Sequence, residues 1–308
     1  MTNLITALAG GVGAARFLTG LVKKVKQENL TIIVNTGDDI EMHGLHISPD
    51  LDIVTYTLAG IVDKTKGWGI DGDTFQFLDA LKKLGVKTWF SLGDRDLATH
   101  VYRTDLLRRG KLLSEVTAAL THTFGVTAKI LPMTDDRFET RIVTERGTVH
   151  FQEYLVKRQA QDRVLGVEFA GVDSAKAASG VIEALKNASL VVVCPSNPIV
   201  SIGTILSVNG VRDALRQSDA RKVAVSPIVA GAAIKGPAGQ LLRGLGLEVS
   251  AYAVAKLYSD FLDVFVIDPA DIEQKERIEK LGVEVKVTNS IMRTLKDKVN
   301  LANVVLKA

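Results

Sequence analysis

Cysteine is almost absent from this 308-residue sequence, in which Cys194 stands alone. One cysteine cannot form an internal disulfide or build a cysteine-based zinc site, and the lack of a disulfide framework fits a reducing compartment. We therefore expect a cytoplasmic protein. Cys194 itself closes a buried apolar run, which predicts an inert core thiol.

Long apolar runs and a large excess of charge of one sign are also absent. No run approaches the roughly 18 residues of a membrane span, and no basic residue precedes Arg16, so we expect neither a membrane helix nor a secretory signal. Lysine plus arginine is 38 and aspartate plus glutamate is 35, a net charge of +3. That balance argues against a partner made of nucleic acid or anionic membrane.

Short apolar runs separated by helix-sized segments are the strongest pattern present, and they are typical of buried parallel strands joined by crossover helices. The expected strands are 4–8, 30–35, 190–194, 221–226 and 261–268. The expected helices include 14–24, 175–186, 211–217, 270–281 and 291–306. Because the alternation occurs at both ends of the chain, we predict an α/β fold with one Rossmann-like open parallel sheet.

Two stretches interrupt this alternation. Residues 52–126 show helical periods without a convincing strand, which predicts a helical insertion. Residues 127–157 carry β-branched, partly alternating runs, which predict a small antiparallel β appendage with a hairpin bend at 145–147. No linker or repeat divides the chain, so we expect a single domain over residues 1–308.

The first candidate site is a glycine loop, in which Gly10, Gly11 and Gly13 stand between the first strand and the first helix in LAGGVGAARF. Three glycines permit tight turning and bring helix-end N–H groups close to a phosphate. The string is neither a G-x-G-x-x-G fingerprint nor a Walker motif. Phosphate binding and a plain strand-to-helix turn are both open here.

The second candidate is the acid-rich connection after the second strand, which carries Asp38, Asp39, Asp50 and Asp52. It is expected to leave the carboxyl end of its strand, where open parallel sheets bind ligands. One interpretation is helix capping by Ser48 or Asp50. The other is a magnesium site, because hard cations take oxygen ligands and a diphosphate needs a cation to offset its charge. Zinc is disfavoured, because the histidines of this connection have no cysteine nearby.

Three further strings place polar side chains at the ends of predicted elements. In SLGDRDLATH, Arg95 at a helix start is either a planar fork for phosphate or carboxylate or a surface base. In VVVCPSNPIV and VAVSPIVAG, two buried strands end in proline-containing turns that present Ser196, Asn197 and Ser226, and Lys235 is the cation that follows. Two such turns suggest one shared crevice.

The following strings occur in order along the chain: GGVGAARF, NTGDD, SPDLD, GDRDLATH, LPMTDD, HFQEY, PSNPIVSIG, SPIVAG, GPAG and DFLDVFVID. Together they resemble the 2-phospho-L-lactate transferase family of deazaflavin coenzyme (factor 420) biosynthesis, including its phosphoenolpyruvate-using bacterial members. The resemblance runs from Gly10 to about Asp268. The glycine loop resembles the bacterial-type GGVGGARF, with alanine at residue 14, and departs from the archaeal-type GGTGTPKL, so the identity of the three-carbon acid stays open.

The resemblance implies a transferase reaction between two small molecules. The donor is a guanosine diphosphate-linked lactate or enolpyruvate, and the acceptor is the ribityl hydroxyl of 7,8-didemethyl-8-hydroxy-5-deazariboflavin, with GMP as the leaving group. The family also implies Mg²⁺ as the cofactor and a homodimer as the assembly. Phosphoryl transfer depends on positioning and charge neutralisation, so the lack of a Ser-His-Asp or Cys-His signature is expected.

Site residues follow from the same resemblance. Asp50 and Arg95 are expected to contact the acceptor in catalysis, with Asp50 also able to bind the metal or to take the hydroxyl proton. The expected magnesium ligands are Asp38, Asp39, Asp50 and Asp52. The expected nucleotide and diphosphate cradle is Gly10, Gly11, Gly13, Ser196, Asn197 and Ser226. Supporting roles fall to His150, Lys235 and, by stacking on the deazaflavin, Trp68.

Two other functions are weighed against this one. An NAD(P)-dependent oxidoreductase would also use a glycine loop, but its second strand should end in an acid that holds the ribose, and here that strand ends in Asn35. A non-catalytic nucleotide-binding regulator of the same fold would need the glycine loop but not Asp50 and Arg95.

Overall fold

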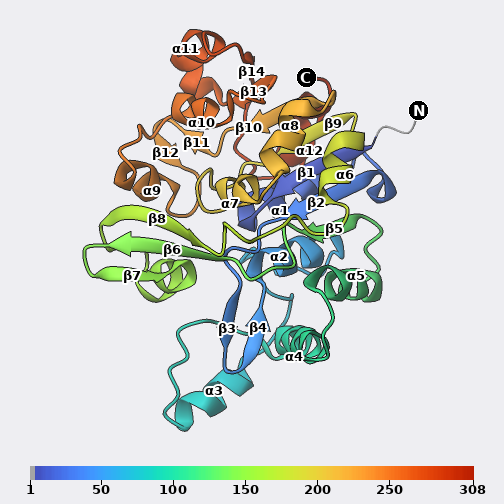
Figure 1. The fold of residues 1–308 in the computed structure, drawn as a ribbon, viewed down its shortest axis with the longest axis vertical. Helices are drawn as coiled ribbons and strands as arrows, with labels where there is room; N and C mark the ends of the chain where they lie inside the picture. Colours follow the sequence, from blue (N-terminus) through green and yellow to red (C-terminus); the bar gives the residue numbers. More distant parts are fainter. Residues whose placement is uncertain (1–3) are drawn as a thin grey trace.

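The fold is built on a seven-stranded sheet (Figure 1), seen in a computed structural model that describes residues 4–308. The strand order is β14-β13-β10-β9-β1-β2-β5, and every neighbouring pair is parallel. The strands are β1 (Ile5–Ala9), β2 (Leu30–Val34), β5 (Lys129–Pro132), β9 (Leu190–Val193), β10 (Arg221–Val225), β13 (Val264–Ile267) and β14 (Glu284–Val287). The predicted α/β class with an open parallel sheet is confirmed.

Both faces of the sheet are covered because the central strands are apolar on both sides. In β1, Leu8 packs into one core while Ala7 and Ala9 pack into the other. The second core includes residues of α1 (Gly11–Leu21), α2 (Pro49–Leu58), α5 (Leu113–Thr123) and α12 (Leu295–Leu306). The first includes residues of α6 (Val181–Asn187), α7 (Ile202–Ser207), α8 (Val211–Gln217), α9 (Ala238–Gly244), α10 (Ala251–Tyr258) and α11 (Lys275–Glu279). The result is a three-layer α/β/α arrangement.

The long connection between β2 and β5 contains all of residues 52–126, the predicted helical insertion. Its later helices, α3 (Gln76–Lys83), α4 (Asp94–Arg108) and α5, lie close to the predicted helical periods. Two features differ from the prediction. Helix α2 begins before residue 52 and packs into the second core, and a hairpin of β3 (Ile40–Met42) and β4 (Leu45–Ile47) precedes it. Figure 1 shows this hairpin and α3 extending away from the sheet.

The antiparallel appendage has different bounds from those predicted. The run at its start forms β5, which pairs in parallel with β2 at the edge of the main sheet, because Ile130 and Leu131 are buried there. The antiparallel sheet consists of β6 (Glu139–Thr144), β7 (Gly147–His150) and β8 (Val164–Ala170), so it extends beyond residue 157. The predicted hairpin is the β6–β7 pair.

Smaller elements complete the chain. They are the hairpin of β11 (Ile228–Val229) and β12 (Ala232–Ala233), the 3₁₀ segments Gln27–Asn29 and Pro269–Gln274, and the π-helical turn Glu153–Lys157. Within residues 4–308, no helix is long and apolar enough to span a membrane.

The contact between α1 and α12 provides a test of the packing. A Cβ atom at Gly20 would lie 2.3 Å from the backbone oxygen of Lys298. Gly20→Ala should therefore lower the free energy of unfolding by about 1–3 kcal/mol, measured by urea denaturation. The matched control is Gly239→Ala in α9, where the nearest atoms would lie at 3.6 Å, so helix propensity should leave stability equal or up to about 1 kcal/mol higher. Equal stability of both variants would contradict the packing described for α1.

Candidate active site

A cavity of about 470 Å³ lies at the carboxyl ends of the central strands. Its lining includes the segments that follow β1, β2, β9 and β10, represented by Gly11, Asp38, Ser196 and Pro227. Since β1 pairs with β2 on one side and with β9 on the other, the cavity lies where the strand order reverses. Open α/β sheets bind ligands at this switch point.

The glycine loop is fixed against the turn that follows β9. The Gly10 N–H donates to Oγ of Ser196 over 3.2 Å, and that hydroxyl donates to the Gly10 carbonyl over 2.8 Å. A Cβ atom at Gly13 would lie 2.2 Å from the Pro195 carbonyl oxygen. Gly11 has φ of +66°, a left-handed conformation that favours glycine. Gly10, which precedes α1, has no side chain to cap the helix, and the Gly11 N–H faces the Asp50 carboxylate, where it partly offsets the rise in pKa that burial causes. The N-terminus of a helix favours an anion.

Asp50 faces this loop from the first turn of α2. Its Oδ2 accepts a hydrogen bond from Nδ2 of Asn35 over 3.0 Å, and a Cβ atom at Gly10 would lie 3.0 Å from the same oxygen. Burial raises the pKa of Asp50 to about 7. Ser48 precedes the helix without a side-chain capping bond, so helix capping does not account for this carboxylate.

Asp38 and Asp50 form a buried pair of like charges. Burial raises the pKa of Asp38 well above its usual range, and the charge of Asp50 raises it further. Oδ1 of Asp38 is buried and has no hydrogen-bond partner among residues 4–308. Two desolvated carboxylates with an unused oxygen favour a cation, and Mg²⁺ prefers such oxygen ligands while it keeps several waters or substrate oxygens.

Of the other two predicted magnesium ligands, Asp52 has both oxygens bound by another side chain, whereas Asp39 has one bound oxygen and one, Oδ1, that is buried without a partner among the described residues. Oδ2 of Asp39 accepts from Oγ of Ser48 over 2.7 Å and lies 3.0 Å from Nε2 of His46, and Asp39 does not line the cavity. The guanidinium of Arg103 binds both oxygens of Asp52, with Nη1 at 3.1 Å from Oδ2 and Nη2 on Oδ1. The structure therefore brings Asp38 and Asp50 together and assigns Asp52 to an ion pair.

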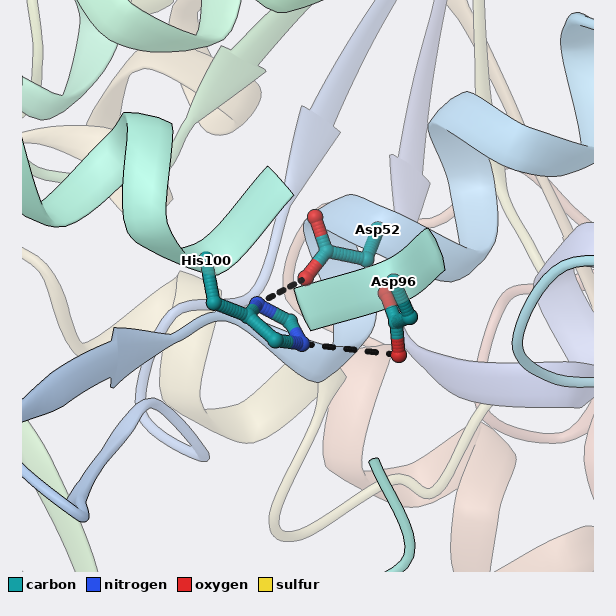
Figure 2. Close-up of side chains that lie close together, drawn as sticks. All are labelled: Asp52, Asp96 and His100. Atoms are coloured by element: carbon teal, nitrogen blue, oxygen red, sulfur yellow. Dashed lines mark ion pairs between the residues drawn. The ribbon is translucent and has the colours of Figure 1, made fainter. Parts of the chain in front are cut away.

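Arg103 belongs to a buried polar cluster that was not predicted from the sequence, and Figure 2 shows three other members of it, Asp52, Asp96 and His100. His100 lies between two acids, with Nδ1 at 3.7 Å from Asp52 Oδ2 and Nε2 at 3.4 Å from Asp96 Oδ2. The hydroxyl of Tyr56 donates to Oδ1 of Asp96 over 2.7 Å. The available signal was the spacing of residues 96, 100 and 103, which places three polar side chains on one face of α4.

The acidic part of this cluster resembles a metal site in its residue types. Among residues 4–308, the side chains whose ligand atoms lie within 4.8 Å of one another are those of Asp52, Asp96 and His100. Arg103 already supplies a positive charge there, and its Nη1 lies 3.2 Å from Nδ1 of His100. We therefore assign this cluster to hydrogen bonding and the magnesium prediction to Asp38 and Asp50.

Several other predicted residues lie outside the cavity lining. Arg95 is exposed, and its Nη1 donates to the Asp71 carbonyl over 3.0 Å. Ser226 is fully buried, and its hydroxyl donates to the Ile228 carbonyl over 2.8 Å, so it shapes the turn after β10. His150 donates from Nε2 to the Asp39 carbonyl over 3.1 Å while its Nδ1 accepts from the Gln152 N–H, so both ring nitrogens are occupied.

Asn197, Lys235 and Trp68 do line the cavity, together with Arg16, which the sequence analysis left unassigned. No acid of the described residues forms an ion pair with Arg16 or Lys235, and the positive charge near Lys235 is that of Arg16. Long side chains on a helix point back toward its N-terminus, so the Arg16 side chain is directed toward the cavity end of α1. The cavity lining thus contains positively charged side chains, Arg16 and Lys235, in addition to its buried acids.

Comparisons with known proteins match the chain over almost its whole length. Residues 5–304 match the family described as 2-phospho-L-lactate transferase CofD. The chain is 42% identical over 299 residues to the 2-phospho-L-lactate transferase of Methanosarcina acetivorans, covering 97% of each protein. It is 43% identical over 309 residues to the phosphoenolpyruvate transferase of Kitasatospora aureofaciens, covering 98% of this chain and 96% of that one.

The fold also has a solved counterpart. A protein of the UPF0052 family from Bacillus halodurans superimposes with a TM-score of 0.63 and 16% identity, covering 99% of each chain. That likeness concerns the fold alone. The family match over almost the whole length and the relatives above 40% identity decide the classification: the chain belongs to the 2-phospho-L-lactate transferase CofD family and is a transferase.

Proposed function

We propose that this protein transfers a phospho-lactyl or phospho-enolpyruvyl group from a guanosine diphosphate-linked three-carbon acid to the ribityl hydroxyl of 7,8-didemethyl-8-hydroxy-5-deazariboflavin. The new bond joins the hydroxyl oxygen to the phosphorus that bears the acid, and the bond from that phosphorus to GMP breaks. The product is a precursor of coenzyme factor 420. The observation that carries the proposal is the buried Asp38–Asp50 pair facing an uncapped helix N-terminus inside the cavity.

The donor half of the site would consist of the glycine loop and the two cations of the cavity lining. The N–H groups at the start of α1 point a partial positive charge at a diphosphate, and Arg16 and Lys235 add full charges. Ser196 holds the loop in place through its reciprocal bonds with Gly10. These groups orient the donor and offset its negative charge, which is the main requirement of phosphoryl transfer.

Asp38 and Asp50 would hold Mg²⁺, which supplies charge neutralisation on the diphosphate when it is bound. The donor set fits: both are carboxylates, both are buried, and Oδ1 of Asp38 has no partner among the described residues. Asp50 is also suited to accept the proton of the attacking hydroxyl, because burial raises its pKa to about 7 and Asn35 fixes its Oδ2.

An oxidoreductase role finds no support in the geometry. The second strand is followed directly by Asn35, whose amide donates to Asp50 and whose Oδ1 accepts from the Gly37 N–H over 2.9 Å. No acid therefore occupies the position at the end of β2 that would bind the ribose of a dinucleotide.

Replacement of Asp50 tests the acid pair. Asp50→Asn should reduce turnover by about 100-fold or more, the range of a lost general base, and should weaken the dependence of activity on Mg²⁺. Removing one of two buried like charges should not lower the unfolding temperature. Product formation across a magnesium titration and thermal unfolding measure both. Glu41→Gln, on the exposed hairpin, is the control and should match the wild type. Near-native turnover of Asp50→Asn at saturating Mg²⁺ would refute the assignment.

The glycine loop is tested at Gly11. A valine there would resist the positive φ and crowd the bound phosphates, so Gly11→Val should lower GDP affinity at least about tenfold in calorimetric titrations. Gly60→Val is the matched control. Gly60 also has a positive φ, of +75°, but a Cβ atom added there would have no neighbour within 4 Å, and the residue lies outside the cavity. If both variants bind GDP like the wild type, the loop is only a packing turn.

Arg95 remains proposed as an acceptor contact. One of its N–H groups bonds to the Asp71 carbonyl, which leaves the rest of the guanidinium for a ligand. Arg95→Lys keeps the charge but loses the planar fork, so the apparent affinity for the deazaflavin should fall roughly 10- to 150-fold in saturation kinetics. Arg109→Lys, exposed at the other end of α4, should have no effect. A change confined to the donor's KM would place Arg95 in the diphosphate half instead.

A further inference from the structure

His100 carries a ring nitrogen that the protein leaves without a partner. The side chain is 1% exposed and lines the cavity, and its Nε2 forms no hydrogen bond with any described residue. The Asp96 carboxylate lies 3.4 Å from Nε2, but the geometry does not make a hydrogen bond. A buried polar atom without a partner is costly, and a ligand in the cavity would satisfy it.

The neighbours of His100 determine which nitrogen carries the proton. Arg103 has only donors, and its Nη1 lies 3.2 Å from Nδ1 of His100, so Nδ1 must be the acceptor. With Nδ1 accepting, the ring proton is on Nε2. Asp52 holds the guanidinium of Arg103 through both oxygens, and this pairing keeps the tautomer fixed. The unpartnered atom is therefore a hydrogen-bond donor.

The charge around His100 limits the kind of atom that it can bind. Asp52 and Asp96 carry two negative charges against the single positive charge of Arg103, so this wall of the cavity is negative. A phosphate or carboxylate would be repelled there, whereas the glycine loop, Arg16 and Lys235 attract such groups. The fitting partner is an uncharged oxygen, such as a ring carbonyl or a sugar-alcohol hydroxyl.

We propose that the Nε2–H group of His100 donates a hydrogen bond to a neutral oxygen of the acceptor substrate, and that Asp52 and Arg103 hold the ring in the tautomer that does so. This inference rests on the proposed function, because the acceptor is the substrate of the pair that is rich in uncharged oxygens. Asp96 lies 3.4 Å from Nε2 at the edge of the ring and itself accepts a hydrogen bond from the Tyr56 hydroxyl.

The test measures binding of the deazaflavin alcohol and of GDP separately, by fluorescence titration and calorimetry on the full-length chain. His100→Leu removes the donor and should raise the deazaflavin Kd about 5- to 150-fold while leaving the GDP Kd within twofold. His100→Gln places an amide N–H near the position of Nε2 and should recover most of the affinity. An equal loss in both variants would show that His100 only shapes the wall and would overturn the proposal.

A matched control separates this effect from damage to α4. Thr104 lies one turn beyond His100, donates from Oγ1 to the His100 carbonyl over 2.7 Å, and does not line the cavity. Thr104→Val should lower the unfolding temperature without changing the deazaflavin Kd. If it weakens deazaflavin binding as much as His100→Leu does, the loss comes from the helix and the proposal fails.

A measurement on the wild type covers the case in which His100 variants do not fold. The chain has 5 histidines, so ¹⁵N-histidine labelling gives a spectrum simple enough to assign. The Nε2 resonance of His100 should shift when the deazaflavin binds and stay in place when GDP binds. Deazaflavin binding without such a shift would refute this inference but leave the proposed function standing. A wild type that binds no deazaflavin would refute both.

Discussion

The contact between the glycine loop and the turn after β9 is the constraint on which the whole site depends. Gly10 and Ser196 exchange two hydrogen bonds across the point where the strand order reverses, and Gly13 allows the Pro195 carbonyl to approach the first turn of α1. A larger side chain at either glycine would push these segments apart. The position of the α1 N-terminus, and with it the floor of the cavity, follows from this close approach.

Electrostatics then divides the cavity into regions of different sign. The helix end, Arg16 and Lys235 favour oxyanions, while Asp38 and Asp50 form a desolvated acidic pair that favours a cation. Asp52 contributes to neither region, since its charge is offset by Arg103. Distinguishing these acids required coordinates, because four aspartates in one connection look equivalent in the sequence, although the folded chain pairs Asp52 with Arg103, Asp39 with Ser48 and Asp50 with Asn35.

The sequence predicted the architecture well where one physical signal dominated. Buried parallel strands such as β1 and β9 are apolar on both faces, so their runs were recognisable without any alignment. Elements without that signal were missed: β14 alternates charged and apolar residues at the sheet edge, and β3 and β4 are three residues each. β5 was placed in the wrong sheet, because pairing partners depend on the chain's path and not on local composition.

For the site, the sequence identified the glycine loop and the acids but not the partners that decide their roles. Asp96 stands at the start of α4, a position typical of a capping acid, and only the structure shows it bonded to Tyr56 from another helix. Ser226 looked like a cradle residue, yet its hydroxyl is used within its own turn. Most of these errors concern contacts that only the folded chain creates, which spacing alone does not reveal.

The long connection between β2 and β5 has an evolutionary consequence. It supplies Asp38, Asp50, Tyr56, Trp68 and His100, whereas the glycine loop, Arg16, Ser196 and Lys235 come from segments attached to other strands. Insertions or substitutions in this one connection can therefore remodel one wall of the cavity while the glycine loop and the turn after β9 stay intact. Such a division lets a lineage alter one side of the cavity without rebuilding the other.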